Sequence, residues 1–209
     1  MITIEKSRRV LTCTDGKTVL TFPVFLGFAP VGHKEKEGDG KTPVGFYRVC
    51  TVNRESKFHL SFGLNYPNAD DAKRALSEKR IGLIDFLRIV IPDLLRLRPA
   101  WNTPLGGFVM IHGEHPDGKT GDWTQGCIAM RNEDIDVLGK HVKVGEKVEI
   151  KEWTVVGRSI FCCLFEFALV FLEEIVVGTH VFQLPPLLHH LAAVVHVDDA
   201  GALHGEQEG

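Results

Sequence analysis

The chain has 209 residues, 44% of them apolar, which allows either one large domain or one domain with an appendage. Its formal net charge of −3 gives no electrostatic reason to expect a nucleic-acid partner. The five cysteines show no Cys-x-x-Cys spacing, so the sequence offers neither a zinc knuckle nor a thioredoxin-type redox pair.

The N-terminus shows no signal peptide, because residues 1–9 pass from a short apolar run straight into charged residues. This predicts a cytoplasmic protein, unless the start is truncated. Residues 8–26 predict a β-hairpin, since two apolar strands flank Asp15-Gly16, a pair typical of a type I′ turn. A Gly- and Lys-rich loop follows over residues 27–45. Two further strands are predicted at residues 45–49 and 58–62.

Residues 68–98 change to a helical period of apolar residues. Asn68 can cap a helix that runs through Leu76. Ile84–Leu97 predicts a second helix, which we expect Pro99 to end.

The next segments return to a β pattern. Gly107–His112 predicts a buried strand that stops at a histidine. Asn132 is expected to cap a short helix through Leu138, with two acidic residues in its first turn. Lys147–Lys151 alternates in polarity and predicts a closing strand.

The composition changes at about residue 152. Of 24 Lys and Arg residues only Arg158 lies beyond Lys151, whereas five of ten histidines do. The apolar stretch 160–177 contains three glutamates, which argues against a transmembrane helix. We therefore predict a domain over residues 2–151 and an atypical apolar, His-rich tail over residues 152–209. Its last twelve residues have a composition typical of disorder.

His112 and Cys127 form the candidate catalytic pair. A polar loop separates the strand-end histidine from the cysteine. If this loop turns the chain back along the strand, the cysteine can lie beside the histidine. A thiolate is a nucleophile, and an imidazole can generate it. Gly126 would let a substrate carbonyl approach backbone N–H groups. The alternative is a buried cysteine with only a packing role, and spacing alone does not decide between the two.

The residues around this pair resemble the L,D-transpeptidases, the YkuD-type catalytic domains. That family carries a histidine, a variable loop, and then Ser or Thr, any residue, Gly, Cys and an aliphatic residue. Here the second motif is Thr-Gln-Gly-Cys-Ile at residues 124–128, after His112-Gly113. Residues 41–45, Lys-Thr-Pro-Val-Gly, are similar to a Lys-Thr-Pro-x-Gly motif of the family. The resemblance covers about residues 2–151.

The chain departs from the family pattern at two positions. Gln125 stands where many members have His, and Ala129 stands where many have an Arg that helps to hold the site or a substrate carboxylate. Arg131 could substitute for that arginine, or it could be an exposed salt-bridge partner. The pattern also resembles a subgroup of murein endopeptidase- or amidase-like members, so transferase and hydrolase both remain open.

The resemblance implies a mostly β catalytic domain with short helices, arranged like a sandwich, that acts on peptidoglycan stem peptides in the periplasm or cell envelope. Cys127 would be the nucleophile and His112 the general base and acid. Gly126, Thr124 and Gly113 would support the site. No metal or organic cofactor is implied, and no integral membrane span is expected.

Substrate-binding candidates are Arg131, Tyr66 and Trp123, whereas Trp101 is expected to pack in the core. Three functions compete: an acyltransferase that forms crosslinks, a hydrolase (L,D-carboxypeptidase, endopeptidase or amidase), and a non-catalytic wall-binding module. The intact pair of His112 and Cys127 argues against the third.

Overall fold

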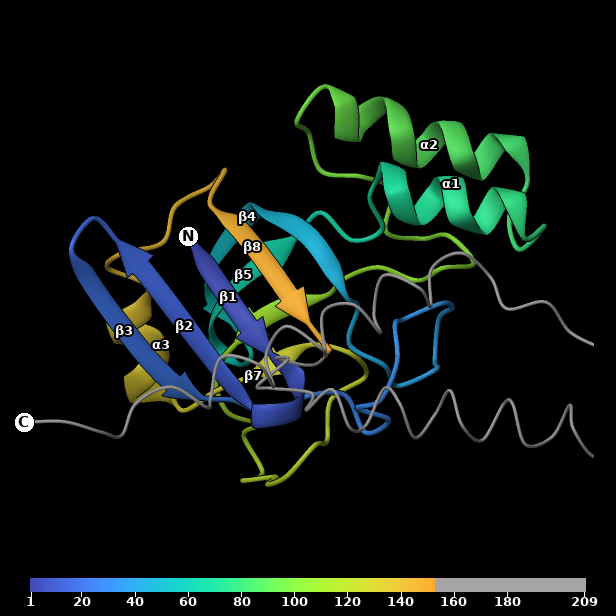
Figure 1. The fold of residues 1–209 in the computed structure, drawn as a ribbon. Helices are drawn as coiled ribbons and strands as arrows, with labels where there is room; N and C mark the ends of the chain where they lie inside the picture. The colour runs from blue at the N-terminus through green and yellow to red at the C-terminus, as the bar shows by residue number, and fades with distance from the viewer. Residues whose placement is uncertain (153–209) are drawn as a thin grey trace, which may run out of the picture. The chain divides into compact units, whose positions relative to one another are not determined.

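The computed structural model describes residues 1–152, and the predicted tail from residue 153 onward lies outside the described residues. The described part is mostly β with three short α-helices, which confirms the predicted fold class (Figure 1). The strands are β1 Ile2–Glu5, β2 Val10–Asp15, β3 Thr18–Pro23, β4 Gly45–Ser56, β5 His59–Leu64, β6 Met110–His112, β7 Ile128–Ala129 and β8 Lys147–Lys151. The helices are α1 Ala69–Ser77, α2 Leu83–Leu94 and α3 Asn132–Leu138, and a 3-10 turn covers Lys6–Arg8.

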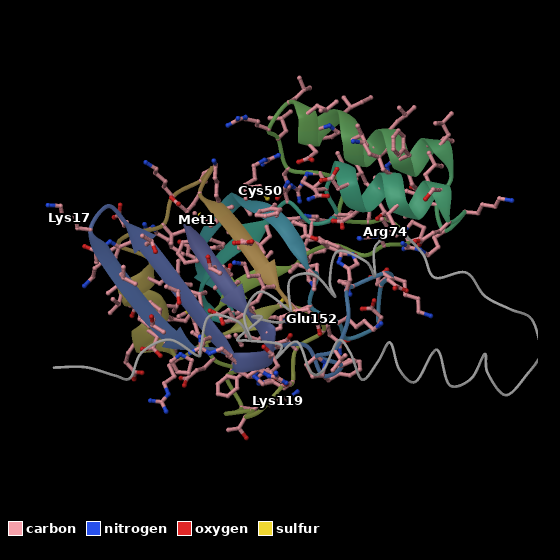
Figure 2. The ribbon with its side chains drawn as sticks, viewed as in Figure 1. Met1, Lys17, Cys50, Arg74, Lys119 and Glu152 are labelled. Atoms are coloured by element: carbon pink, nitrogen blue, oxygen red, sulfur yellow. The ribbon has the colours of Figure 1, made fainter. Side chains whose placement is uncertain are left out.

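All eight strands belong to one sheet in the order β3-β2-β1-β8-β4-β5-β6-β7. β1 lies between antiparallel β2 and parallel β8. The long strand β4 pairs with β8 through its first residues and with β5 through the rest, so it joins the two halves of the sheet. Figure 2 shows Cys50 on this strand and Lys17 at the tip of the β2–β3 hairpin.

The sheet curls until its two ends meet. Phe25, just after β3, exchanges two backbone hydrogen bonds of 2.8 Å with Ala129 of β7, the strand at the other end of the order. Alternate side chains along the strands point inward and form a closed apolar core. This core includes Ile4, Leu11, Phe62, Ile111 and Ile128, each 0 or 1% exposed.

The helical hairpin α1–α2 follows β5. Asn68 caps α1 as predicted, since its Oδ1 accepts from the Asp71 amide at 3.0 Å and the Asp71 carboxylate accepts from the Asn68 amide at 3.0 Å. The prediction for α2 was wrong at its end, which falls at Leu94. Arg96 adopts a left-handed φ of 58°, and the Leu97 amide donates back to the Pro92 carbonyl. Within residues 1–152, no helix is long and apolar enough to cross a membrane.

The predicted cap of α3 was also wrong. The residue before the helix is Arg131, and Asn132 is its first residue. The Asn132 Oδ1 is used elsewhere, because it accepts a hydrogen bond of 3.0 Å from the Glu114 amide. Asn132 therefore ties α3 to the loop that follows His112.

Candidate active site

The sheet register places Cys127 and His112 on one face of neighbouring strands. β6 and β7 are parallel, and Ile111 pairs with Ile128 in the core. Because successive side chains alternate between the two faces, the residues next to this pair point to the opposite face. His112 follows Ile111, and Cys127 directly precedes Ile128. The β6–β7 pairing thus places the strand-end histidine and the predicted nucleophile on neighbouring segments, with His112 opposite Ala129 and Cys127 two residues before Ala129.

The Cys127 thiol is half-buried and donates a hydrogen bond of 3.3 Å to the Phe108 carbonyl. Burial raises the pKa of this thiol above its usual value. A hydrogen bond from the Met110 backbone and the nearby charge of Lys34 oppose the shift but do not cancel it. The resting Cys127 side chain is therefore a neutral thiol.

His112 is 2% exposed, and its Nδ1 lies 2.7 Å from the Gly113 carbonyl oxygen. A carbonyl can only accept, so Nδ1 carries the proton and Nε2 has the free lone pair. Burial lowers the pKa of the imidazole. The hydrogen bond to Gly113 opposes this shift, while His115 and Lys57 add to it. His112 is therefore a neutral base with a fixed tautomer.

Aromatic rings hold the His112 side chain in place. Phe58, in the turn between β4 and β5, stacks on the imidazole with a centroid distance of 4.5 Å and an interplanar angle of 24°. Trp123 lies against the same imidazole at 5.6 Å, and His115 packs edge-on against Trp123 at 5.0 Å. His115 is thus part of this cluster.

Thr124 and Gly126 shape the turn that precedes Cys127, the predicted nucleophile. The Thr124 hydroxyl donates to the Cys127 carbonyl at 2.7 Å and accepts from the Gly126 amide at 3.1 Å. Gly126 has φ +125°, and a Cβ there would lie 2.5 Å from the Lys41 carbonyl oxygen, so only glycine fits. Because its amide is already bonded to Thr124, the role of Gly126 in this structure is to make the turn rather than to offer a free N–H.

Gly113 is required for a similar reason. Its amide donates to the Phe58 carbonyl at 2.9 Å, and its carbonyl orients His112. A Cβ at this position would lie 2.6 Å from the Phe58 carbonyl oxygen and would also clash with the Asn132 side chain. A larger residue would therefore displace the partner of His112.

A buried ion pair below the nucleophile turn was not predicted from the sequence. Lys34 is 3% exposed, and its ammonium donates to Asp39 at 2.8 Å and to the Gln125 carbonyl at 3.5 Å. Asp39 also accepts from the backbone amides of Glu35, Lys36 and Lys41. The loop that contains the Lys-Thr-Pro-x-Gly motif therefore supports the nucleophile turn from below. Sequence spacing gave no signal for a pairing between Lys34 and residue 125.

Two of the three predicted substrate-binding residues lie together. Trp123 and Arg131 line a pocket of about 620 Å³ next to the aromatic cluster, although neither Cys127 nor His112 lines it. Other charged or titratable residues of its lining are Lys57, His59, Glu114, His115 and Lys119. Figure 2 shows Lys119 on the loop between β6 and β7.

The third candidate, Tyr66, is a core residue. It is 1% exposed, and its hydroxyl donates to the carbonyls of Lys34 and Leu105. Trp101 is also buried, as expected. Its ring contacts Phe108 at 4.6 Å, and Phe108 is 58% exposed while its carbonyl accepts from the Cys127 thiol. Phe108, missed in the sequence, thus offers an apolar surface beside the nucleophile.

Comparisons with known proteins place this chain in a family. Residues 1–150 match the YkuD model, the L,D-transpeptidase catalytic domain. Among solved structures, the helical cell shape determining protein Pgp2 from Campylobacter jejuni matches with 20% identity and a TM-score of 0.52, over 81% of this chain and 55% of that chain. Bd1075 from Bdellovibrio bacteriovorus matches with 22% identity and a TM-score of 0.48, over 83% of this chain and 55% of that chain.

The chain thus spans about half of the length of these two proteins. No curated protein shows significant sequence similarity to it. The family model, which covers well over half of the chain, shows that this chain belongs to the L,D-transpeptidase catalytic domain (YkuD) family.

Proposed function

We propose that the protein catalyses cysteine-dependent acyl transfer on peptidoglycan stem peptides, with Cys127 as the nucleophile and His112 as the general base and acid. The observation that carries the proposal is the tautomer of His112. Its Nδ1 donates to the Gly113 carbonyl at 2.7 Å, which leaves the lone pair of Nε2 to take a proton, and the β6–β7 pairing puts Cys127 on the neighbouring segment.

In the first step, Sγ turns from the Phe108 carbonyl toward His112 and gives its proton to Nε2. The thiolate attacks the carbonyl carbon of the peptide bond after the third stem residue. The imidazolium then protonates the leaving nitrogen, and the terminal D-amino acid departs, which leaves a thioester on Cys127. The Gly113 carbonyl stabilises the positive charge on His112 throughout.

An acceptor completes the cycle. An amine that attacks the thioester gives a crosslink, and His112 takes the proton of that amine. Water in the same position gives a carboxypeptidase or endopeptidase product. The pocket lined by Trp123, Lys119 and Arg131 suits the carboxylates of stem peptides, because it combines an aromatic wall with cationic side chains. This chemistry implies a cell-envelope location.

Hydrolysis is the second candidate, and Ala129 favours it. Ala129 is 1% exposed within β7 and has no charged group, whereas many family members have an arginine at this position. Arg131 is exposed and belongs to the neighbouring pocket. Another residue therefore has to hold the site or the substrate carboxylate in place of that arginine, or the acceptor is water.

Mass spectrometry of muropeptides after incubation with the purified protein tests both candidates. A D-amino acid added as the amine acceptor should appear in the product if the protein is a transferase, and only shortened peptides should form if it is a hydrolase. Cys127→Ala should abolish either product. Cys13→Ala and Cys50→Ala are matched controls, because those cysteines lie on strands β2 and β4, and both variants should remain active. Full turnover by Cys127→Ala would refute the mechanism.

A further inference from the structure

Helix α2 has one wide apolar arc, and only part of this arc faces the protein. At 100° per residue, Phe86, Ile89 and Val90 share the side that packs against α1. The adjoining side of the helix, which ends with the capping residue Leu95, is also apolar and remains exposed: Leu83 63%, Ile84 76%, Leu87 43%, Ile91 51%, Leu94 73% and Leu95 65%. Figure 1 shows α2 on the outer side of α1, away from the sheet. Six large apolar side chains on one arc are more than scattered surface residues.

The segment that contains α2 carries a net positive charge, although Arg80 pairs with Glu78 just before it. Residues 79–98 contain five Lys and Arg but two Asp, a net charge of +3 in a chain whose formal net charge is −3. Both acids are engaged, because Asp85 pairs with Arg88 at 3.0 Å and Asp93 accepts from Arg48 at 3.0 Å.

Two cations remain uncommitted at the ends of the helix. Lys79 precedes α2 and Arg96 follows it, both are exposed, and neither side chain forms a hydrogen bond or ion pair with another described residue. The arc therefore combines an apolar strip with a free positive charge at each end.

We propose that the exposed face of α2 binds an anionic lipid surface, with the helix lying flat in the interface. An amphipathic helix of this kind buries its apolar side chains between the lipid headgroups while Lys and Arg pair with lipid phosphates. A second copy of the chain suits the face less well, because two such faces would bring like charges together. A helix of 12 residues is also only about 18 Å long, which is short for the roughly 800 Å² per partner of a stable dimer.

Lipid binding by α2 does not depend on the proposed chemistry at Cys127, and the full chain is used to test it. Vesicles of phosphatidylglycerol and phosphatidylcholine, and vesicles of phosphatidylcholine alone, are sedimented with the protein at low and high salt. The full chain should partition at least about tenfold more strongly onto the anionic vesicles at low salt, and high salt should remove most of the difference.

Two variants identify the surface. Ile84→Gln with Leu94→Gln should weaken binding to anionic vesicles about tenfold or more, because two large apolar side chains leave the interface. Lys79→Asn with Arg96→Asn should weaken binding at low salt only, and asparagine tolerates the left-handed φ of 58° at both positions. Val19→Gln with Val144→Gln is the matched control, since these valines are 62% and 59% exposed elsewhere, and it should bind like the unmodified chain.

The proposal is overturned if the full chain does not sediment with anionic vesicles. It is also overturned if the Ile84 and Leu94 variant binds as well as the unmodified chain, since another segment would then hold the lipid. Concentration-dependent dimers in light scattering that the same substitutions abolish, without lipid binding, would assign the face to a second copy. Thermal unfolding of each variant should match that of the unmodified chain, because the substituted side chains are exposed.

Discussion

At Cys127 burial raises the pKa of the thiol, and at His112 burial lowers the pKa of the imidazole. Both shifts favour the uncharged form, so the resting pair at neutral pH is thiol and imidazole rather than thiolate and imidazolium. The hydrogen bond from Cys127 to the Phe108 carbonyl agrees with this state, because only a protonated thiol can donate. In the proposed mechanism the thiolate therefore has to form during turnover, by proton transfer to His112, because the resting thiol keeps its proton.

Alkylation of Cys127 tests this protonation state. The rate of its reaction with iodoacetamide should rise with pH through an apparent pKa above the usual range of a thiol, with no plateau near neutral pH. His112→Ala should lower muropeptide turnover by about 10²–10⁴-fold, because the general base is lost. The alkylation rate of this variant at high pH, where the thiolate forms without help, should equal that of the unmodified protein. A plateau of the alkylation rate at pH 6–7 would indicate a preformed ion pair and contradict the prediction.

At the scale of elements, the sequence predicted the strands, turns and helix caps that are determined by residues close together in the chain. The β2–β3 hairpin follows from the Asp15-Gly16 turn, in which Gly16 has φ +58°. The α1 cap follows from the chemistry of Asn68. β1 was missed because it is four residues long and its parallel partner β8 lies at the other end of the domain. The two-residue strand β7 was missed because only its pairing with β6 defines it.

In the candidate site, too, only the residues that belong to a local motif were predictable from the sequence. The motif gave Cys127 and His112, and the β6–β7 pairing puts them on neighbouring segments; their catalytic roles stay a prediction. Phe58 and Lys34 were not predictable, since each reaches the site from a distant turn or loop, and a single lysine or phenylalanine carries no spacing signal. Tertiary contact, rather than local sequence, decides these supporting residues.

The loop between β3 and β4 depends on the buried pair of Lys34 and Asp39. Lys34→Met should destabilise the protein by about 3–5 kcal/mol, because the Asp39 carboxylate would keep its charge at a buried position without its cation. The double substitution Lys34→Met with Asp39→Asn should lower the free energy of unfolding by less, because no buried charge is left without a partner. Lys36→Met, an exposed lysine of the same loop, should stay within about 0.5 kcal/mol in urea unfolding.

The pH dependence of stability has a definite sign. Burial raises the pKa of Asp39, but the hydrogen bonds from Lys34 and three backbone amides outweigh it, and the net pKa is below the usual value. The stabilisation is therefore complete above the ordinary carboxyl pKa and is lost as the pH falls through the lowered one. Lys34→Met should move this loss to higher pH. An equal loss of stability in the Lys34 and Lys36 variants would contradict a structural role for the buried pair.

At the scale of the whole molecule, Glu152 closes the described domain. Its carboxylate accepts from the Lys6 ammonium at 2.7 Å and from the Gly32 amide at 2.9 Å, and Lys6 is 1% exposed. Burial lowers the pKa of Lys6, and the hydrogen bond and charge of Glu152 oppose that shift. The composition of the chain changes at the same position, since only Arg158 among the Lys and Arg residues lies further on. We propose that residues beyond Glu152 are a dispensable extension or the product of a shifted reading frame.

A chain that ends at Trp153 tests this proposal, because it keeps Glu152 and removes the rest. If the extension is dispensable, this chain should match the full chain in melting temperature and in muropeptide turnover. It should be equally or more soluble, since the apolar stretch 160–177 is gone. Glu152→Ala in the shortened chain is the contrast: it leaves Lys6 buried without its carboxylate and should cost about 3 kcal/mol, or roughly 6–12 °C in melting temperature. A similar loss in the shortened chain that retains Glu152 would instead mean that residues beyond 153 bury part of the core.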